Sequence, residues 1–299
     1  MTLNKILFGI TLLAAGIVFL VYRTQTKPVV ESKRTEMKHV PREVAQKAQV
    51  TKPTTAWRVP ILMYHYVEFV KDKNDKLREA LDVIPPIFDE QMKTLKDAGY
   101  TFMTASELAD VIDGKRVMPP KPILITFDDG HWDLATDVLP ILKKYDVKAT
   151  AYIISGFIGG SDNLSRAQLT AVANSGLIEI GAHTVHHVSL KGKLAPIVAL
   201  EVNLSKEQIE AMIHRPVVSF AYPNGSFDQQ AIDIVRKAGF RTAVSTIPGE
   251  TVTNANRYFL FRLRPGNRTG QTFLNYLDSV KDDVFLVPQT PTPIPKSTP

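Results

Sequence analysis

The sequence predicts an α/β protein, a distorted TIM-like (β/α)7 barrel that follows an N-terminal transmembrane helix. Two observations predict the barrel. Short apolar runs rich in β-branched residues alternate with longer segments of helical period, and polar residues follow several runs where a strand would end. Strands that alternate with helices form a mostly parallel sheet covered by helices. In such barrels, functional side chains lie at the carboxyl ends of the strands.

The N-terminus contains the predicted membrane helix. Lys5 precedes an apolar run from Ile6 to Tyr22, which is just long enough to cross a bilayer and longer than most signal-peptide cores. No signal-peptidase site follows the run, and Gly16 stands where a lipoprotein would need a cysteine. We therefore expect residues 1–22 to be an uncleaved anchor.

Two segments without core periodicity flank one large domain. Residues 23–57 are polar and charged, as in a linker. Residues 288–299 are rich in Pro and Thr and should be extended and disordered. The segment 58–287 between them is long enough for one barrel with a substantial core.

Seven apolar runs and seven helical patterns alternate within this domain. The runs lie around residues 61–66, 123–127, 149–154, 178–180, 217–221, 242–245 and 259–263. The helical patterns cover Phe88–Ala98, Ala105–Asp113, Leu134–Tyr145, Ser165–Ser175, Ala195–Ile213, Asp228–Ala238 and Thr272–Val280. This alternation predicts parallel strands joined by crossover helices.

Composition excludes several classes of function. The chain has no cysteine, so it has neither a disulfide framework nor a thiol nucleophile. The net charge of +6 is scattered, and basic clusters interleaved with aromatic residues are lacking, so we expect no nucleic-acid partner. A basic exterior suits an anionic cell wall instead. The oligomeric state has no signature in the sequence.

Two adjacent carboxylates follow a predicted buried strand. The run 123–125 leads into the segment 126–130, which contains Asp128 and Asp129 and ends at Gly130. Neighbouring side chains on a strand point to opposite faces, so the two carboxylates can share a site only if the chain turns there, as Gly130 allows. Seen alone, the segment would be an Asp-Gly turn with a helix cap.

A histidine cluster follows another predicted strand. His183 and His187 are four residues apart, and in one helical turn such a pair faces the same way. With Asp129, the two imidazoles would hold a divalent metal and leave a position open for water, as catalytic sites do. Zinc is the default for these ligands, although cobalt, nickel or iron would also fit.

With these two motifs, the chain resembles the polysaccharide deacetylases of carbohydrate esterase family four, which share a NodB-like homology domain. Residues 126–130 match the first family motif, His183–His187 match the second, and Phe220–Gly225 form a variant third. The resemblance covers about residues 58 to 265. It implies that Asp129, His183 and His187 bind the metal.

The resemblance also implies the roles of other groups in the reaction. Asp128 would be the general base, and a backbone N–H at the turn formed by Tyr222 and Pro223 would stabilise the oxyanion. Two departures from the family pattern stand out. Phe220 lies where the third motif usually has an Arg that orients the catalytic Asp, and no His follows His214, although the fifth motif usually contains one.

Two residues elsewhere are the predicted replacements. The Tyr-His sequence that ends at His65 is similar to the branch that deacetylates poly-N-acetylglucosamine adhesins, in which an early His is the general acid. The same branch has an Arg in a late strand, which favours Arg262 here. The alternative for His65 is a strand-end histidine bonded to a backbone carbonyl, and the alternative for Arg262 is a surface ion pair.

Three residues near the motifs have weaker predictions. Trp132 offers an apolar wall for a sugar ring, or packs at the start of the following helix. His131 and His186 do not match the ligand positions of the family, so we expect them near the metal ligands or at the rim of the site.

The prediction is a metal-dependent hydrolase that removes N-acetyl groups from an N-acetylglucosamine-containing cell-surface polysaccharide, either an exopolysaccharide or peptidoglycan. The alternatives are an O-deacetylase of an acetylated glycan and an inactive wall-anchored glycan-binding protein. Such a substrate lies outside the cell. The basic flank after Tyr22 argues against export of the domain, but long domains translocate largely regardless of charge. We therefore expect a single-pass membrane protein with an extracellular catalytic domain.

Overall fold

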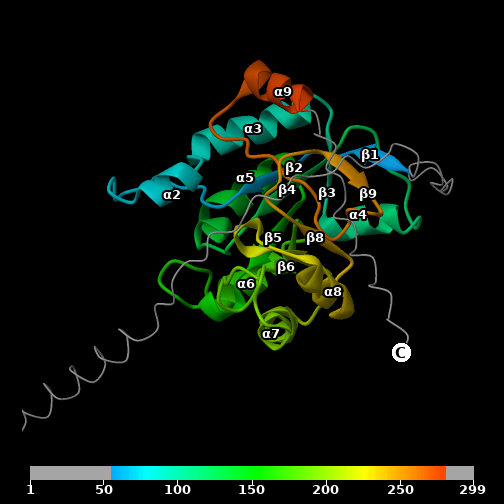
Figure 1. Ribbon diagram of the computed structural model, residues 1–299. Helices are drawn as coiled ribbons and strands as arrows, with labels where there is room; N and C mark the ends of the chain where they lie inside the picture. Colours follow the sequence, from blue (N-terminus) through cyan, green and yellow to red (C-terminus); the bar gives the residue numbers. More distant parts are fainter. Residues whose placement is uncertain (1–54, 281–299) are drawn as a thin grey trace, which may run out of the picture. The chain divides into compact units, whose positions relative to one another are not determined.

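The computed structural model describes residues 55–280 and has an α/β fold built on a curled parallel sheet (Figure 1). The sheet has the order β2-β4-β5-β6-β7-β8, with β3 paired to β4. Its strands are β2 (Ile61–Tyr64), β3 (Thr101–Met103), β4 (Pro122–Phe127), β5 (Ala149–Ile153), β6 (Ile178–Ala182), β7 (Ser219–Ala221) and β8 (Thr242–Val244). The α/β class and the parallel sheet are confirmed.

The two edge strands of this sheet both bond to the predicted seventh strand. In the segment 260–263, Leu260 forms a parallel bridge to Val244 of β8, and Leu263 forms one to Leu62 of β2. The segment makes one bridge on each side and is therefore not a regular strand. It joins the sheet edges and places its residues at the same end of the strands as the predicted site.

Helices cover the sheet. They are α2 (Lys76–Leu81), α3 (Pro85–Asp97), α4 (Ala105–Ile112), α5 (Leu139–Tyr145), α6 (Arg166–Ala173), α7 (Ala195–Ile213), α8 (Gln229–Lys237) and α9 (Gly270–Ser279). Figure 1 shows them on the outside of the sheet, where α3 packs against α5 and α9, and α7 packs against α6 and α8. The seven predicted helical patterns correspond to α3–α9, and a π-helical turn at Leu134–Val138 precedes α5.

Local sequence explains where several helices begin. Thr104 and Ser165 form capping boxes at the starts of α4 and α6, because each hydroxyl accepts the N–H three residues on, while Glu107 or Gln168 accepts the cap N–H in return. Proline in the first turn starts α3 and α7, where its missing N–H has no cost. These N-terminal residues set where each of the four helices begins.

Four elements have no counterpart in the sequence prediction. Strand β3 and helix α2 are short, and a separate antiparallel pair joins β1 (Ala56–Arg58) to β9 (Thr251–Thr253). Strand β1 includes Ala56 and Trp57, which the predicted linker 23–57 contained.

The main core lies between the sheet and its helices, and the side chains of the seven-stranded sheet are almost entirely buried. Residues 55–280 include no helix that is both long and apolar enough to cross a membrane. The predicted anchor 1–22, nearly all of the linker and the tail 288–299 lie outside the described residues.

Candidate active site

The two carboxylates after β4 diverge because the chain turns sharply between them and the next residue. Asp129 has φ 72° and Gly130 has φ 77°, both in the left-handed region. A Cβ on Gly130 would lie 2.9 Å from Cδ1 of Ile153, so glycine suits this position in both conformation and space. The turn places Asp128 and Asp129 at the mouth of one cavity, as the sequence predicts.

The histidine cluster after β6 is an irregular loop. His183 follows the last residue of β6, and Thr184 and His187 have φ values of 65° and 55°. The expected helical turn was therefore wrong, and the two imidazoles converge through left-handed residues instead. Their ring centroids are 5.0 Å apart.

A buried carboxylate on α7 fixes this loop. One oxygen of Glu201 accepts hydrogen bonds from the N–H groups of Val185 and His186, at 2.9 and 3.0 Å. Its other oxygen lies 2.8 Å from Nδ1 of His186. The predicted role of His186 near the ligands does not hold, because its side chain is turned to Glu201, is 61% exposed and does not line the cavity.

Asp129, His183 and His187 form the candidate metal site. One ligand atom from each lies within 4.8 Å of the others, and Oδ1 of Asp129 is 3.4 Å from Nε2 of both histidines. That oxygen is buried and has no hydrogen-bond partner among the described residues. A buried carboxylate oxygen facing two imidazole nitrogens fits a divalent cation.

A backbone contact sets the tautomer of His183. Its Nδ1 lies 2.8 Å from the carbonyl oxygen of Ala221, which can only accept, so Nδ1 donates the proton. Nε2 is then left with its lone pair directed toward Asp129. A hydrogen bond on the second ring nitrogen is how proteins orient a metal-binding histidine.

Asp128 is held by Arg262, which comes from the segment that joins the sheet edges. The guanidinium donates to both carboxylate oxygens at 2.7 Å, and it also donates to Oγ1 of Thr126 and the carbonyl oxygen of Ser245. Both partners are almost fully buried. Burial raises the pKa of Asp128, but the adjacent guanidinium more than offsets this, so the pKa lies below its usual value.

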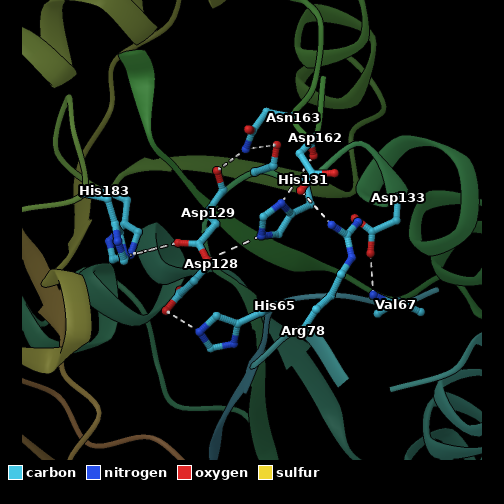
Figure 2. A network of polar contacts seen from close by, with 12 residues as sticks. His65, Val67, Arg78, Asp128, Asp129, His131, Asp133, Asp162, Asn163 and His183 are labelled. Atoms are coloured by element: carbon cyan, nitrogen blue, oxygen red, sulfur yellow. Dashed lines mark hydrogen bonds and ion pairs between the residues drawn. The ribbon is translucent and has the colours of Figure 1, made fainter. Parts of the chain in front are cut away.

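His65 follows β2 and faces Asp128. Its Nε2 lies 4.0 Å from Oδ2 of Asp128, and it lines the same cavity. Figure 2 shows the two side chains facing each other. Burial lowers the pKa of His65 to about 4, although the carboxylates of Asp128 and Asp129 act in the opposite direction. The imidazole is therefore neutral at neutral pH before anything binds.

His131 is the third imidazole beside Asp129. Its Nε2 lies 3.5 Å from Oδ2 of Asp129, the oxygen that does not face the other two histidines. Its Nδ1 lies 3.3 Å from the carbonyl oxygen of Asp162, and its ring stacks on Tyr66 at 3.8 Å between centroids. Figure 2 shows this chain of contacts from Asp162 through His131 to Asp129.

The predicted oxyanion donor needs a correction. The N–H of Tyr222 donates to the carbonyl oxygen of Val244 at 3.2 Å, and Pro223 has no N–H. The ring of Tyr222 is fully buried against Phe227, away from the cavity. The N–H at this turn that makes no hydrogen bond within the described part of the chain belongs to Asn224, which lines the cavity.

The site cavity has a volume of about 620 Å³ and opens at the carboxyl ends of the strands. It contains the three candidate metal ligands, Asp128 and His65, and its rim includes Leu77, Phe157, Asn224 and Arg264. Trp132 is not part of it. That side chain lines a neighbouring cavity, so the sequence prediction of a wall at the active site was wrong.

Three comparisons with known proteins agree with this geometry. The family model for polysaccharide deacetylase matches residues 115–243. The Bacillus subtilis protein YxkH, named "Putative polysaccharide deacetylase", is 33% identical over 86% of this chain and 90% of its own length. Poly-beta-1,6-N-acetyl-D-glucosamine N-deacetylase of Staphylococcus aureus is 28% identical, over 59% of this chain and 65% of that protein.

A solved structure has the same fold. The Streptococcus pyogenes deacetylase PplD, determined in complex with acetate, superposes with a TM-score of 0.69 at 28% identity, covering 76% of this chain and all of that one. Together with the match to YxkH along most of both chains, this shows that the protein belongs to the polysaccharide deacetylase family, carbohydrate esterase family four.

Proposed function

We propose that the protein is a metal-dependent N-deacetylase of an N-acetylglucosamine-containing cell-surface polysaccharide. The observation that carries the proposal is the buried oxygen of Asp129, which has no hydrogen-bond partner among residues 55–280 and faces the imidazoles of His183 and His187. The general-base candidate Asp128 lies directly beside it.

A divalent metal held by Asp129, His183 and His187 would supply a Lewis acid and would lower the pKa of a bound water from about 15.7 towards 7. Asp128 accepts the proton of the attacking water. Its ion pair with Arg262 keeps the carboxylate ionised and fixes both oxygens, so that it is ready to accept at neutral pH.

His65 delivers a proton to the leaving nitrogen. Because its pKa is about 4, the imidazole is not protonated at the start of the reaction. The proton that Asp128 takes from water is the source of the proton that His65 delivers, and it must cross the 4.0 Å between Oδ2 of Asp128 and Nε2 of His65 through an intervening group, because that distance exceeds a hydrogen bond. The N–H of Asn224 would donate to the oxyanion of the tetrahedral intermediate.

Two lines of support favour an amide substrate on a glucosamine polymer. The relative from Staphylococcus aureus is named for poly-β-1,6-N-acetylglucosamine. The candidate proton donor His65 in the same cavity matters most for an amine, which leaves poorly until it is protonated. We also propose that the apolar segment 6–22 anchors the protein and that the catalytic domain is extracellular, where such polymers occur.

Acetate release tests this function. Purified protein, loaded with zinc, cobalt or nickel, is incubated with β-1,6- and β-1,4-linked N-acetylglucosamine oligomers and with O-acetylated xylan. We expect acetate from at least one N-acetylglucosamine series and its loss after treatment with a chelator. Release from xylan alone would identify an O-deacetylase, and release from none would support a glycan-binding protein.

A further inference from the structure

A second cavity lies beside the active site. It has a volume of about 430 Å³, and its wall includes the aromatic side chains of Phe69 and Trp132. Phe69 is 63% exposed, so its ring is accessible to a bound molecule. The size is within the range of ligand-binding pockets.

The two cavities share part of their walls. Asp75 and Arg78 line both of them. The guanidinium of Arg78 is bonded to Glu68, which lines the second cavity, and donates to Asp162 of the catalytic cavity at 2.6 Å. Arg78 therefore forms the partition between the cavities, and a linear molecule that crosses it would occupy both.

The partition is also connected to the metal ligands. The guanidinium of Arg78 lies 4.4 Å from the centroid of the Tyr66 ring, and that ring stacks on His131 beside Asp129. Figure 2 shows a second route to His131, from Arg78 through Asp162. A group that binds against Arg78 therefore lies two side chains from the candidate metal site.

The groups in the second cavity suit a pyranose ring. Trp132 offers an apolar face, and its indole N–H donates to no group within residues 55–280, so it can donate to a sugar oxygen. Asp72 and Asp137 each use one carboxylate oxygen in a local hydrogen bond, to the N–H of Asn74 at 2.9 Å and to the hydroxyl of Thr136 at 2.6 Å. The other oxygens can accept from sugar hydroxyls.

We propose that this second cavity is a saccharide subsite that binds another sugar unit of the same polymer whose acetamide lies in the catalytic cavity. The proposal rests on the proposed function for the identity of the polymer. Such a subsite would make the enzyme prefer longer substrates. Short oligomers fill the catalytic cavity alone, and longer ones also contact Trp132.

Fluorescence can test the subsite directly, since the sequence has only two tryptophans, Trp57 and Trp132. Trp57 is in β1, and Trp57→Phe leaves Trp132 as the sole indole. Chelator-treated Trp57→Phe protein, which avoids turnover, is titrated with N-acetylglucosamine oligomers from one to six units. We expect a saturable change in emission with the longer oligomers and none with the monomer.

Activity supplies the second readout. Trp132→Ala should lower kcat/KM about tenfold for the hexamer and leave it unchanged for the shortest oligomer that is cleaved. Trp57→Phe should leave both values unchanged. Acetate release by the wild type from a hexamer that does not alter Trp132 emission would overturn the subsite alone. A change in emission without acetate release would support the subsite and contradict the deacetylase function.

Equal loss of kcat/KM on all oligomers in Trp132→Ala would also contradict the proposal. It would mean that Trp132 stabilises the structure of the cavity wall and does not bind the sugar chain. The unfolding temperature of the variant, compared with that of Trp57→Phe, identifies this case independently of catalysis.

Discussion

Arg262 donates to both carboxylate oxygens of Asp128, at 2.7 Å each, from a position 134 residues further along the chain. The pair connects two parts of the fold, because Asp128 directly follows β4 and Arg262 belongs to the segment that joins the two sheet edges. The contact between this segment and the curled sheet therefore sets the orientation of the candidate base.

Removing this guanidinium should change the pH dependence of catalysis. In Arg262→Met, burial remains as the main influence and raises the pKa of Asp128 above its ordinary value of 3.8. A base is lost as pH falls through its pKa, so the acidic limb of kcat/KM should move to higher pH. Arg262→Lys keeps the charge and should shift the limb less. An unchanged limb in Arg262→Met would mean that another group is the base.

Asp128→Asn should bind metal normally and lose two to four orders of magnitude in rate, since an amide cannot accept the proton. The change leaves the buried charge of Arg262 without its ionic partner, at a cost of about 3–5 kcal/mol in stability. Rates should therefore be measured well below the melting temperature of the variant. Wild-type turnover at neutral pH would exclude Asp128 as the base.

His65→Ala should affect substrates according to their leaving group. We expect a large loss with an acetamide, whose nitrogen must be protonated, and a small loss with an activated aryl acetate, whose phenolate leaves unaided. The comparison uses the same variant and the same metal, so misfolding or metal loss would lower both rates together. Equal losses would assign His65 to packing.

His131 should tune the metal site without binding the metal, because it faces the second oxygen of Asp129 at 3.5 Å. His131→Phe keeps the stack on Tyr66 but removes the ring nitrogen that faces Asp129, and we expect about 10- to 100-fold weaker metal binding. His131→Gln restores a polar group at this position and should recover part of the affinity. Competition with a chromogenic chelator measures this without any assay of catalysis.

The sequence alone predicts those parts of the site that are contiguous in the chain. Asp128 and Asp129 follow one buried strand, and His183 and His187 follow another, so each pair is visible as a short motif. Their meeting follows from the rule that parallel strands end at the same edge. The alternation of apolar runs and helical patterns predicts the parallel sheet for the same reason.

Groups that act through tertiary contacts have no such signature. Glu201 holds the histidine loop from the middle of α7, and the carbonyl of Ala221 sets the tautomer of His183. The N–H of Asn224 is left without a hydrogen bond within residues 55–280, while that of Tyr222, two residues earlier, donates to Val244. Helix α2, with six residues, is too short to show a period, yet Leu77 and Arg78 from it line the catalytic cavity.

The proposed anchor has a separate test in cells. Full-length protein should sediment with membranes, and its catalytic domain should be cut by protease added to intact cells, because the apolar run 6–22 spans the bilayer. A version without residues 1–27 should be soluble and active. Protection of the domain in intact cells, with cleavage only after lysis, would place it on the cytoplasmic side.

The central claim is that Asp129, His183 and His187 hold the catalytic metal, and titration of metal-free protein tests it most directly. Zinc or cobalt is added stepwise while bound metal and acetate release are measured on the same samples. We predict that both rise together and saturate at one ion per chain, and that His187→Ala, which should still fold because a domain of this size does not depend on the ion, gains neither. Full acetate release by metal-free protein, or by His187→Ala without bound metal, would contradict the claim.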